Sequence, residues 1–186
     1  MIIGISGCQR TGKTFAAQKI ADELGLKFVP TNVSSITAKY PKAKSNFKER
    51  MKCQYEILDH FEKLLADDSI VLDRTPVDLL VYTMDAYHWG NVTAQNDQTL
   101  KEYCEKVLTL IPKFDIMILT ELLDVVEQDS SKAPTDQMYM LKIDHMMRSF
   151  GNYHYILKGG SHESRNKSID SIVEAIRSQT MVCTNP

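Results

Sequence analysis

The sequence has few of the features that define several large classes of protein. Its four cysteines, Cys8, Cys53, Cys104 and Cys183, form no CxxC pair and have no histidine at ligand spacing, which indicates neither a zinc site nor a disulfide framework. No apolar run approaches the roughly 18 residues of a membrane-spanning helix, and the opening MIIGIS lacks the basic and apolar regions of a signal peptide. We therefore expect a cytoplasmic protein with no membrane partner.

An excess of charge of either sign is also missing. Lysine and arginine together number 22 and aspartate and glutamate 24, for a formal net charge of −2. The chain thus lacks the basic excess that dominates non-specific binding to nucleic acid, so a polymeric substrate would need a local patch. Lys39, Lys42, Lys44 and Lys48 form a short basic run that would supply one. A solvated surface explains the same run, and both interpretations stay open.

Apolar strand patterns alternate with amphipathic helix patterns along the 186 residues, and no internal repeat is visible. Strands are predicted at residues 1–6, 26–30, 69–72, 114–119 and 153–157, and a loop at 31–45. Helices are predicted at 13–24, 46–66, 77–88, 100–111, 138–150 and 168–177, with Ser45 and Ser168 as caps. No hairpin signal joins two strands, so right-handed crossovers and a parallel sheet covered on both faces are expected. The predicted fold is a three-layer α/β domain over residues 1–186.

The segment GISGCQRTGKT, residues 4–14, lies between the first predicted strand and the first predicted helix. Gly7, Gly12, Lys13 and Thr14 match the P-loop pattern G-x-x-x-x-G-K-[ST]. Glycines let successive backbone N–H groups point inward, and the helix that follows directs its unpaired N–H groups and positive dipole end at phosphate oxygens. Lys13 would reach the β- and γ-phosphates and the Thr14 hydroxyl would ligate Mg²⁺.

We therefore expect a P-loop NTPase fold, with five strands in the order 2-3-1-4-5, that binds ATP and Mg²⁺. The predicted nucleotide-binding residues are Gly7, Cys8, Gln9, Arg10, Thr11, Gly12, Lys13, Thr14 and Phe15. Arg10 could face either the phosphates or solvent, and the sequence does not choose between them.

Asp73 and Arg74 end the third predicted strand, which would bring them to the γ-phosphate. Asp73 is in the position of a second Mg²⁺ ligand. An arginine behind that aspartate suits a site with a second anionic group, or a transition state that spreads charge over equatorial oxygens. Lys13, Asp73 and Arg74 are accordingly candidate catalytic residues.

GISGCQRTGKT followed by a strand that ends in DRTP resembles the nucleoside and nucleotide kinase group, in which thymidylate kinases carry DR[YFHW] at this place. DRTPVDLLVYT together with FVPTNVSS resembles more closely the small phage-type P-loop kinases. These include deoxynucleoside monophosphate kinases and kinases of hydroxymethyluracil in DNA. If the chain is phage-encoded, its cytoplasm is that of a host cell.

The resemblance implies further site residues and a lid-like insertion near residues 124–137. Arg148 is where nucleotide kinases commonly supply a phosphate-clamping arginine, and Arg165 is in a segment that packs on the adenine. The chain departs from the group in two ways. The second strand is not followed by the carboxylate typical of deoxynucleoside kinases, and the lid segment contains no arginine, only Lys132.

Acceptor-binding residues are expected where the second and third strands end and on the helices that follow. Asp78 and Tyr82 are one turn apart and share a helix face. The candidate acceptor residues are Asn32, Ser34, Ser35, Arg50, Asp73, Arg74, Asp78 and Tyr82. Farther along, helical spacing of Met138, Leu141, Met146 and Phe150 predicts core packing in place of a metal or partner site.

The leading hypothesis is an ATP-dependent phosphotransferase acting on a deoxynucleotide, free or in DNA. A monophosphate acceptor is already an anionic nucleophile, whereas a hydroxymethyl group on a base in DNA would need Asp73 as a general base. A nucleotide-hydrolysing switch or motor subunit is the alternative from another class, although the guanine-binding NKxD element of GTPases is missing. The assembly state, including a homodimer, stays open.

Overall fold

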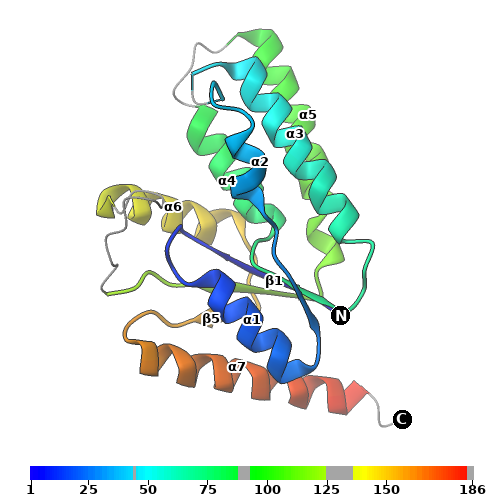
Figure 1. The fold of residues 1–186 in the computed structure, drawn as a ribbon, viewed down its shortest axis with the longest axis vertical. Helices are drawn as coiled ribbons and strands as arrows, with labels where there is room; N and C mark the ends of the chain where they lie inside the picture. The colour runs from blue at the N-terminus through cyan, green and yellow to red at the C-terminus, as the bar shows by residue number, and fades with distance from the viewer. Residues whose placement is uncertain (44, 88–92, 125–135, 184–186) are drawn as a thin grey trace.

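One five-stranded sheet organises the chain in the computed structural model, which describes residues 1–43, 45–87, 93–124 and 136–183 (Figure 1). Its strands are β1 (Ile2–Gly7), β2 (Lys27–Val29), β3 (Ile70–Leu72), β4 (Ile116–Thr120) and β5 (Tyr155–Leu157). Their order is β2-β3-β1-β4-β5, and every neighbouring pair is parallel. The predicted strand order and fold class are confirmed.

The central strand β1 is buried along its whole length, which agrees with its continuous apolar sequence. It pairs with β3 through Gly4 and Leu72 and with β4 through Gly7 and Thr120. Because the strands are parallel, their carboxyl ends meet at one edge of the sheet. This register brings the segments after β1, β3 and β4 side by side.

Helices cover both faces of the sheet. Figure 1 shows α1 (Lys13–Leu24) and α7 (His162–Cys183) below it, where Ile20 and Val173 are part of one buried core. Above it lie α3 (Phe47–Leu64), α4 (Pro76–Tyr87) and α5 (Ala94–Leu108), with α6 (Gln137–Phe150) beside them; Phe61 and Tyr103 belong to this second core. No helix in the described part of the chain is long and apolar enough to cross a membrane.

Helix boundaries follow the prediction at α1, which ends at Gly25 in a left-handed conformation (φ 67°). Elsewhere the structure contains helical turns of mostly polar sequence, which apolar periodicity does not predict. A short helix, α2 (Val33–Ala38), lies in the predicted loop, and a 3₁₀ turn, η1 (Ile111–Lys113), follows α5. Helix α5 begins six residues earlier than predicted, capped by Thr93, whose Oγ1 accepts from Asn96 N at 3.2 Å.

The predicted caps at Ser45 and Ser168 are both wrong. Asn46 caps α3, and its Oδ1 accepts from Glu49 N at 3.1 Å. Ser168 lies inside α7, which already begins at His162, and its Oγ accepts a hydrogen bond from Lys158 N at 3.1 Å. Both errors arise because serine hydrogen-bonds the backbone in helices and loops as well as at helix starts.

Candidate active site

The loop between β1 and α1 has the backbone geometry of an anion cradle. Gly7 and Gly12 have φ angles of 148° and 74°, where side chains are strained, and a Cβ on Gly7 would lie 2.0 Å from Thr120 Oγ1. Gly12 begins α1 with no side-chain cap, and the first turn contains no acidic residue. The N-terminus of α1 therefore presents its amides and its dipole to an anion, which fits a phosphate chain.

Lys13 is buried in this loop, with only 8% of the residue exposed. Its Nζ donates to Gly7 O at 2.8 Å and to Cys8 O at 2.6 Å. Burial, together with the nearby Arg74 guanidinium, lowers the pKa of Lys13 to about 8, against the opposing effect of Asp78. The ammonium is thus held at the loop, where it can neutralise phosphate charge.

Nucleotide affinity should fall as pH rises through the pKa of Lys13, about 8 in the free protein. Loss of the proton removes the cation that attracts phosphate, so the affinity for ATP should weaken by up to about tenfold per pH unit above that pKa. Calorimetric titration between pH 7 and pH 10 measures this change. Lys13→Arg, whose guanidinium stays charged, should give a flat profile. A flat profile for the unmodified protein would contradict the assignment.

The lowered pKa of Lys13 has the opposite effect on the free energy of unfolding. Lys13 ionises near 10.5 when unperturbed and near 8 when folded, so the unfolded chain binds more protons between these values. The contribution of Lys13 to the free energy of unfolding therefore rises as pH increases through that window. Deprotonation of Lys13 therefore should not unfold the protein, so a loss of nucleotide affinity at alkaline pH can be assigned to binding.

Asp73, the first residue after β3, lies against the loop. Its Oδ2 accepts from Thr14 Oγ1 at 2.8 Å, and its Oδ1 accepts from Thr31 N at 3.0 Å and Thr31 Oγ1 at 2.7 Å. A carboxylate beside a threonine hydroxyl fits Mg²⁺, which takes few protein oxygens and keeps water and phosphate ligands. The described residues contain no cluster of three or more side chains that would hold a metal by themselves. Thr31 was missed from sequence, although its place after β2 puts it at the same sheet edge.

Arg74 lies between the loop and α4. Its Nη1 is 3.7 Å from Asp78 Oδ1, and its guanidinium carbon is 5.7 Å from the centre of the Tyr82 ring. The Tyr82 hydroxyl donates to Gln9 Oε1 at 2.9 Å. Gln9 of the loop, Arg74 and Tyr82 are therefore brought together on the side of the loop that faces α4.

Asp78 has a different place from the one predicted for it, since only 1% of it is exposed. Its Oδ2 accepts from Thr75 N at 3.0 Å, while Thr75 Oγ1 accepts from Val77 N at 3.2 Å. The pattern resembles a capping box at the start of α4, with the Thr75 hydroxyl on the amide of Val77 and the Asp78 carboxylate on the amide of Thr75. In the structure Asp78 caps α4 and pairs with Arg74.

Asp78→Ala should lower the free energy of unfolding by about 1–2 kcal/mol, because the Thr75 amide loses its partner in a buried position. Chemical denaturation measures the change. Asp59→Ala, on the exposed face of α3, is the control and should change stability by less than about 0.5 kcal/mol. Equal stability of Asp78→Ala and the unmodified protein would contradict the capping role.

Two further predicted arginines pair with protein groups. Arg148 donates from Nε to Asp144 Oδ2 at 2.8 Å and lies 3.6 Å from Glu121 Oε1, and the Asp144 carboxylate raises its pKa. Glu121 directly follows β4, so Arg148 is at the same sheet edge as the loop. Arg50 instead donates to Ala43 O at 2.8 Å and to Ala86 O. It therefore joins α3 to the far end of α4.

The remaining predicted residues line the loop or the edge of the sheet. Cys8 is buried, donates to Gln9 Oε1 at 3.0 Å, and has a pKa raised by burial to about 12. Arg10 is half-buried in a left-handed conformation (φ 63°), and Phe15 is exposed on α1. Asn32, Ser34 and Ser35 are exposed at the start of α2. Most of the predicted lid, residues 125–135, lies outside the described residues.

Arg165 has almost no surface on which a base could stack, since it is 3% exposed. It donates from Nη1 to Thr11 O at 2.7 Å and from Nη2 to Glu121 O at 3.0 Å. Burial lowers its pKa. Arg165 therefore joins α7 to the backbone of the loop and to the end of β4.

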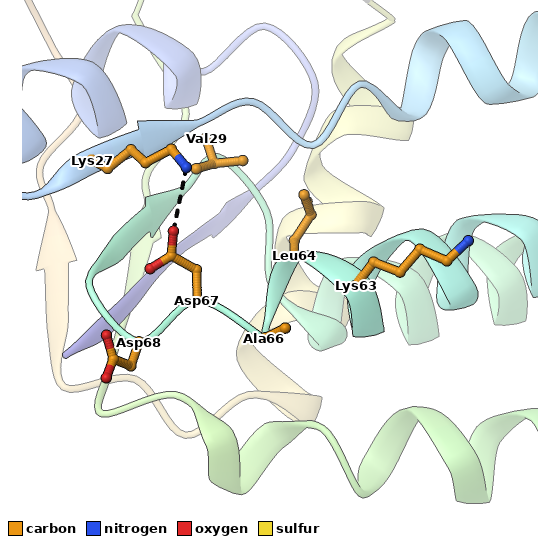
Figure 2. Close-up of a pocket in the computed structure, with 7 residues that line it drawn as sticks. All are labelled: Lys27, Val29, Lys63, Leu64, Ala66, Asp67 and Asp68. Carbon is orange, nitrogen blue, oxygen red and sulfur yellow. Dashed lines mark hydrogen bonds and ion pairs between the residues drawn. The ribbon is translucent and has the colours of Figure 1, made fainter.

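A groove of about 570 Å³ lies at the opposite end of the strands (Figure 2). It is lined by Lys27, Val29, Lys63, Leu64, Ala66, Asp67 and Asp68. Lys27 begins β2 and hydrogen-bonds to Asp67 at 3.3 Å just before β3. Because the loop follows the carboxyl end of β1 in a parallel sheet, this groove is not part of the site.

A family model described as an AAA domain matches residues 2–165. The chain is also similar to deoxyadenosine kinase from M. mycoides with bound dCTP, with a TM-score of 0.69, 19% identity and coverage of 96% of this chain and 100% of that chain. Shikimate kinase from Aquifex aeolicus gives a TM-score of 0.53 at 12% identity, covering 97% of this chain and 99% of that one.

The YorR protein from Bacillus subtilis, solved in complex with phosphorylated GDP, gives a TM-score of 0.51 at 16% identity, with coverage of 98% of this chain and 96% of that chain. No curated protein matches the sequence. At these identities the likeness to solved structures establishes a shared fold, that of the P-loop kinases, over almost the whole chain.

Proposed function

Because the chain belongs to the AAA domain family, and because a carboxylate reaches its nucleotide loop, we propose that it is an ATP-dependent phosphotransferase acting on a deoxynucleotide. The observation that carries this proposal is the contact between Asp73 Oδ2 and Thr14 Oγ1, at 2.8 Å. It joins the end of β3 to the first turn of α1. A Mg²⁺ ligand pair then lies directly beside the lysine that serves the phosphates.

The residues around the loop would have different roles according to their positions. Lys13 and the amides at the start of α1 bind the triphosphate and orient its terminal group. Thr14 and Asp73 would hold Mg²⁺, which would neutralise negative charge on the triphosphate. Arg74, fixed between Asp78 and Tyr82, faces the side of the loop that α4 covers. It would orient the acceptor or the transferring phosphoryl group.

Two observations support a free acceptor over one in DNA. One neighbour in fold is a deoxyadenosine kinase with bound dCTP, whose name indicates a free deoxynucleoside and whose ligand is a free deoxynucleotide. The basic run is also partly neutralised, because Lys39 Nζ lies 2.6 Å from Glu56 Oε1. Lys44 lies outside the described residues. The run then has less positive charge with which to attract the phosphate backbone of DNA.

The proposal is tested with ATP labelled on its γ-phosphate, in the presence of Mg²⁺. The protein is incubated with each deoxynucleoside, each deoxynucleoside monophosphate, and DNA that contains hydroxymethyluracil, and the labelled products are separated. We expect label in a deoxynucleoside diphosphate, formed from one of the monophosphates; label in a monophosphate would identify a deoxynucleoside as the acceptor. Label in the DNA would instead identify the alternative kinase activity, with Asp73 as base. Label that appears only as free phosphate, whatever the acceptor, would contradict both and favour a switch or motor subunit.

A further inference from the structure

Arg165 is a buried arginine in the first turn of α7, next to the nucleotide loop. Its two terminal nitrogens donate to different segments: Nη1 to Thr11 O within the loop and Nη2 to Glu121 O at the end of β4. Glu121 is itself fixed, because its Oε2 accepts from Gly159 N at 3.2 Å. The guanidinium thus ties one loop peptide to a firmly held point of the sheet edge.

The Thr11 carbonyl and the Gly12 N–H belong to the same peptide group. That group is planar and trans, as are all peptide bonds in the described residues, so the C=O and N–H bonds point in opposite directions. With the carbonyl directed at Arg165, the Gly12 N–H is directed away from α7. Gly12 is the residue that opens α1, where the loop would bind phosphate.

Packing alone is a poor explanation for an arginine in this position. Removing a guanidinium from water costs several kcal/mol unless its hydrogen bonds are made. Arg165 Nε is buried and has no hydrogen-bond partner among the described residues. An apolar side chain of similar length would fill the space without this cost. The two carbonyl contacts are what the charged group adds.

We propose that Arg165 is a positioning residue: it fixes the Thr11–Gly12 peptide so that the Gly12 N–H faces the phosphates, an inference that rests on the proposed binding of a nucleoside triphosphate. Arg165 acts on the polyphosphate through the backbone and does not touch the base. The affinity it controls is therefore the affinity for the phosphate chain, with or without adenosine.

The test compares Arg165→Met with Arg177→Met. Arg177 lies on the same helix and donates to Glu23 O and, at 3.3 Å, to Glu23 Oε2, so it also ties α7 to α1 but far from the loop. Calorimetry measures the affinities of each variant for Mg·ATP, inorganic tripolyphosphate and adenosine. For Arg165→Met we expect about tenfold weaker binding of both ATP and tripolyphosphate. Arg177→Met should bind both like the unmodified protein, even if it is equally destabilised.

Each other outcome overturns the inference. Weaker binding of ATP with unchanged binding of tripolyphosphate would mean that Arg165 serves the base. Unchanged binding of both, with loss of stability alone, would make the residue a purely structural link. If Arg165→Met does not fold, the same affinities are measured for Arg165→Lys, whose single ammonium cannot contact both carbonyls. Unchanged affinity of that variant for tripolyphosphate would also overturn the inference. An unmodified protein that binds neither ligand would instead refute the proposed function, and this inference with it.

Discussion

Replacing Lys13 with methionine should reduce phosphoryl transfer by about 10³-fold and leave the protein folded. The methionine keeps the length of the buried stem but removes the ammonium that Gly7 O and Cys8 O hold in the loop. Without it, the charge that spreads over the transferring phosphoryl group is left unneutralised in a site of low dielectric constant. Removing a buried charge need not reduce stability. Steady-state turnover and thermal unfolding measure the two effects separately.

Lys19→Met is the matched control for this variant. Lys19 lies six residues later on α1 and forms an ion pair with Asp170 of α7 at 2.7 Å. Its removal takes away one lysine of the same helix without touching the nucleotide loop, so turnover should not change. Undiminished turnover in Lys13→Met would remove the assignment of the loop as the phosphate site. Equal losses in the two variants would point to the helix as a whole.

Asp73→Asn should lower kcat by about 10²-fold and raise the Mg²⁺ concentration needed for half-maximal activity. The amide can still accept from Thr31 through its oxygen, but its nitrogen cannot accept the Thr14 hydroxyl hydrogen, and the negative charge is lost. The metal would then keep one protein ligand of two. Activity measured across a range of Mg²⁺ concentrations gives both quantities.

Thr31→Val is the control for the aspartate. It removes the Oγ1 donor to Asp73 Oδ1 but keeps the carboxylate charge and the backbone donor from Thr31 N. A smaller loss of turnover, with little change in Mg²⁺ dependence, is expected. An Asp73→Asn variant with the turnover and Mg²⁺ dependence of the unmodified protein would show that this carboxylate does not hold the metal.

The sequence predicts the parts of the fold that depend on local signals. The loop pattern at residues 7–14 lies at the first junction of strand and helix, as expected, and α1 has the predicted bounds. The apolar strand segments and the absence of hairpin signals predicted the parallel sheet, and the P-loop fold predicted its strand order. Asp73 could be placed beside the loop because parallel strands bring their carboxyl ends together.

What the sequence could not predict depends on burial, which tertiary packing decides. On α6, two apolar stripes compete. The predicted stripe is Met138, Leu141, Met146 and Phe150, of which Met138, Leu141 and Phe150 are 75%, 42% and 45% exposed and Met146 packs against the core in part. The buried stripe is Met140, Ile143 and Met147, displaced by about two residues around the helix. Asp78 and Arg165 were likewise expected to face a ligand, because both carry charge, yet both are buried. No feature of the neighbouring sequence distinguishes a buried charged residue from an exposed one.

Parallel measurement of ADP and free phosphate, with Mg·ATP and with or without the best deoxynucleotide acceptor, distinguishes group transfer from hydrolysis. If the protein transfers the terminal phosphoryl group of ATP to a second molecule, ADP and phosphorylated acceptor should form in equal amounts. ADP formation should fall to a low background when the acceptor is left out. ADP that forms at the same rate without any acceptor, matched by free phosphate, would contradict the assignment of this protein as a kinase.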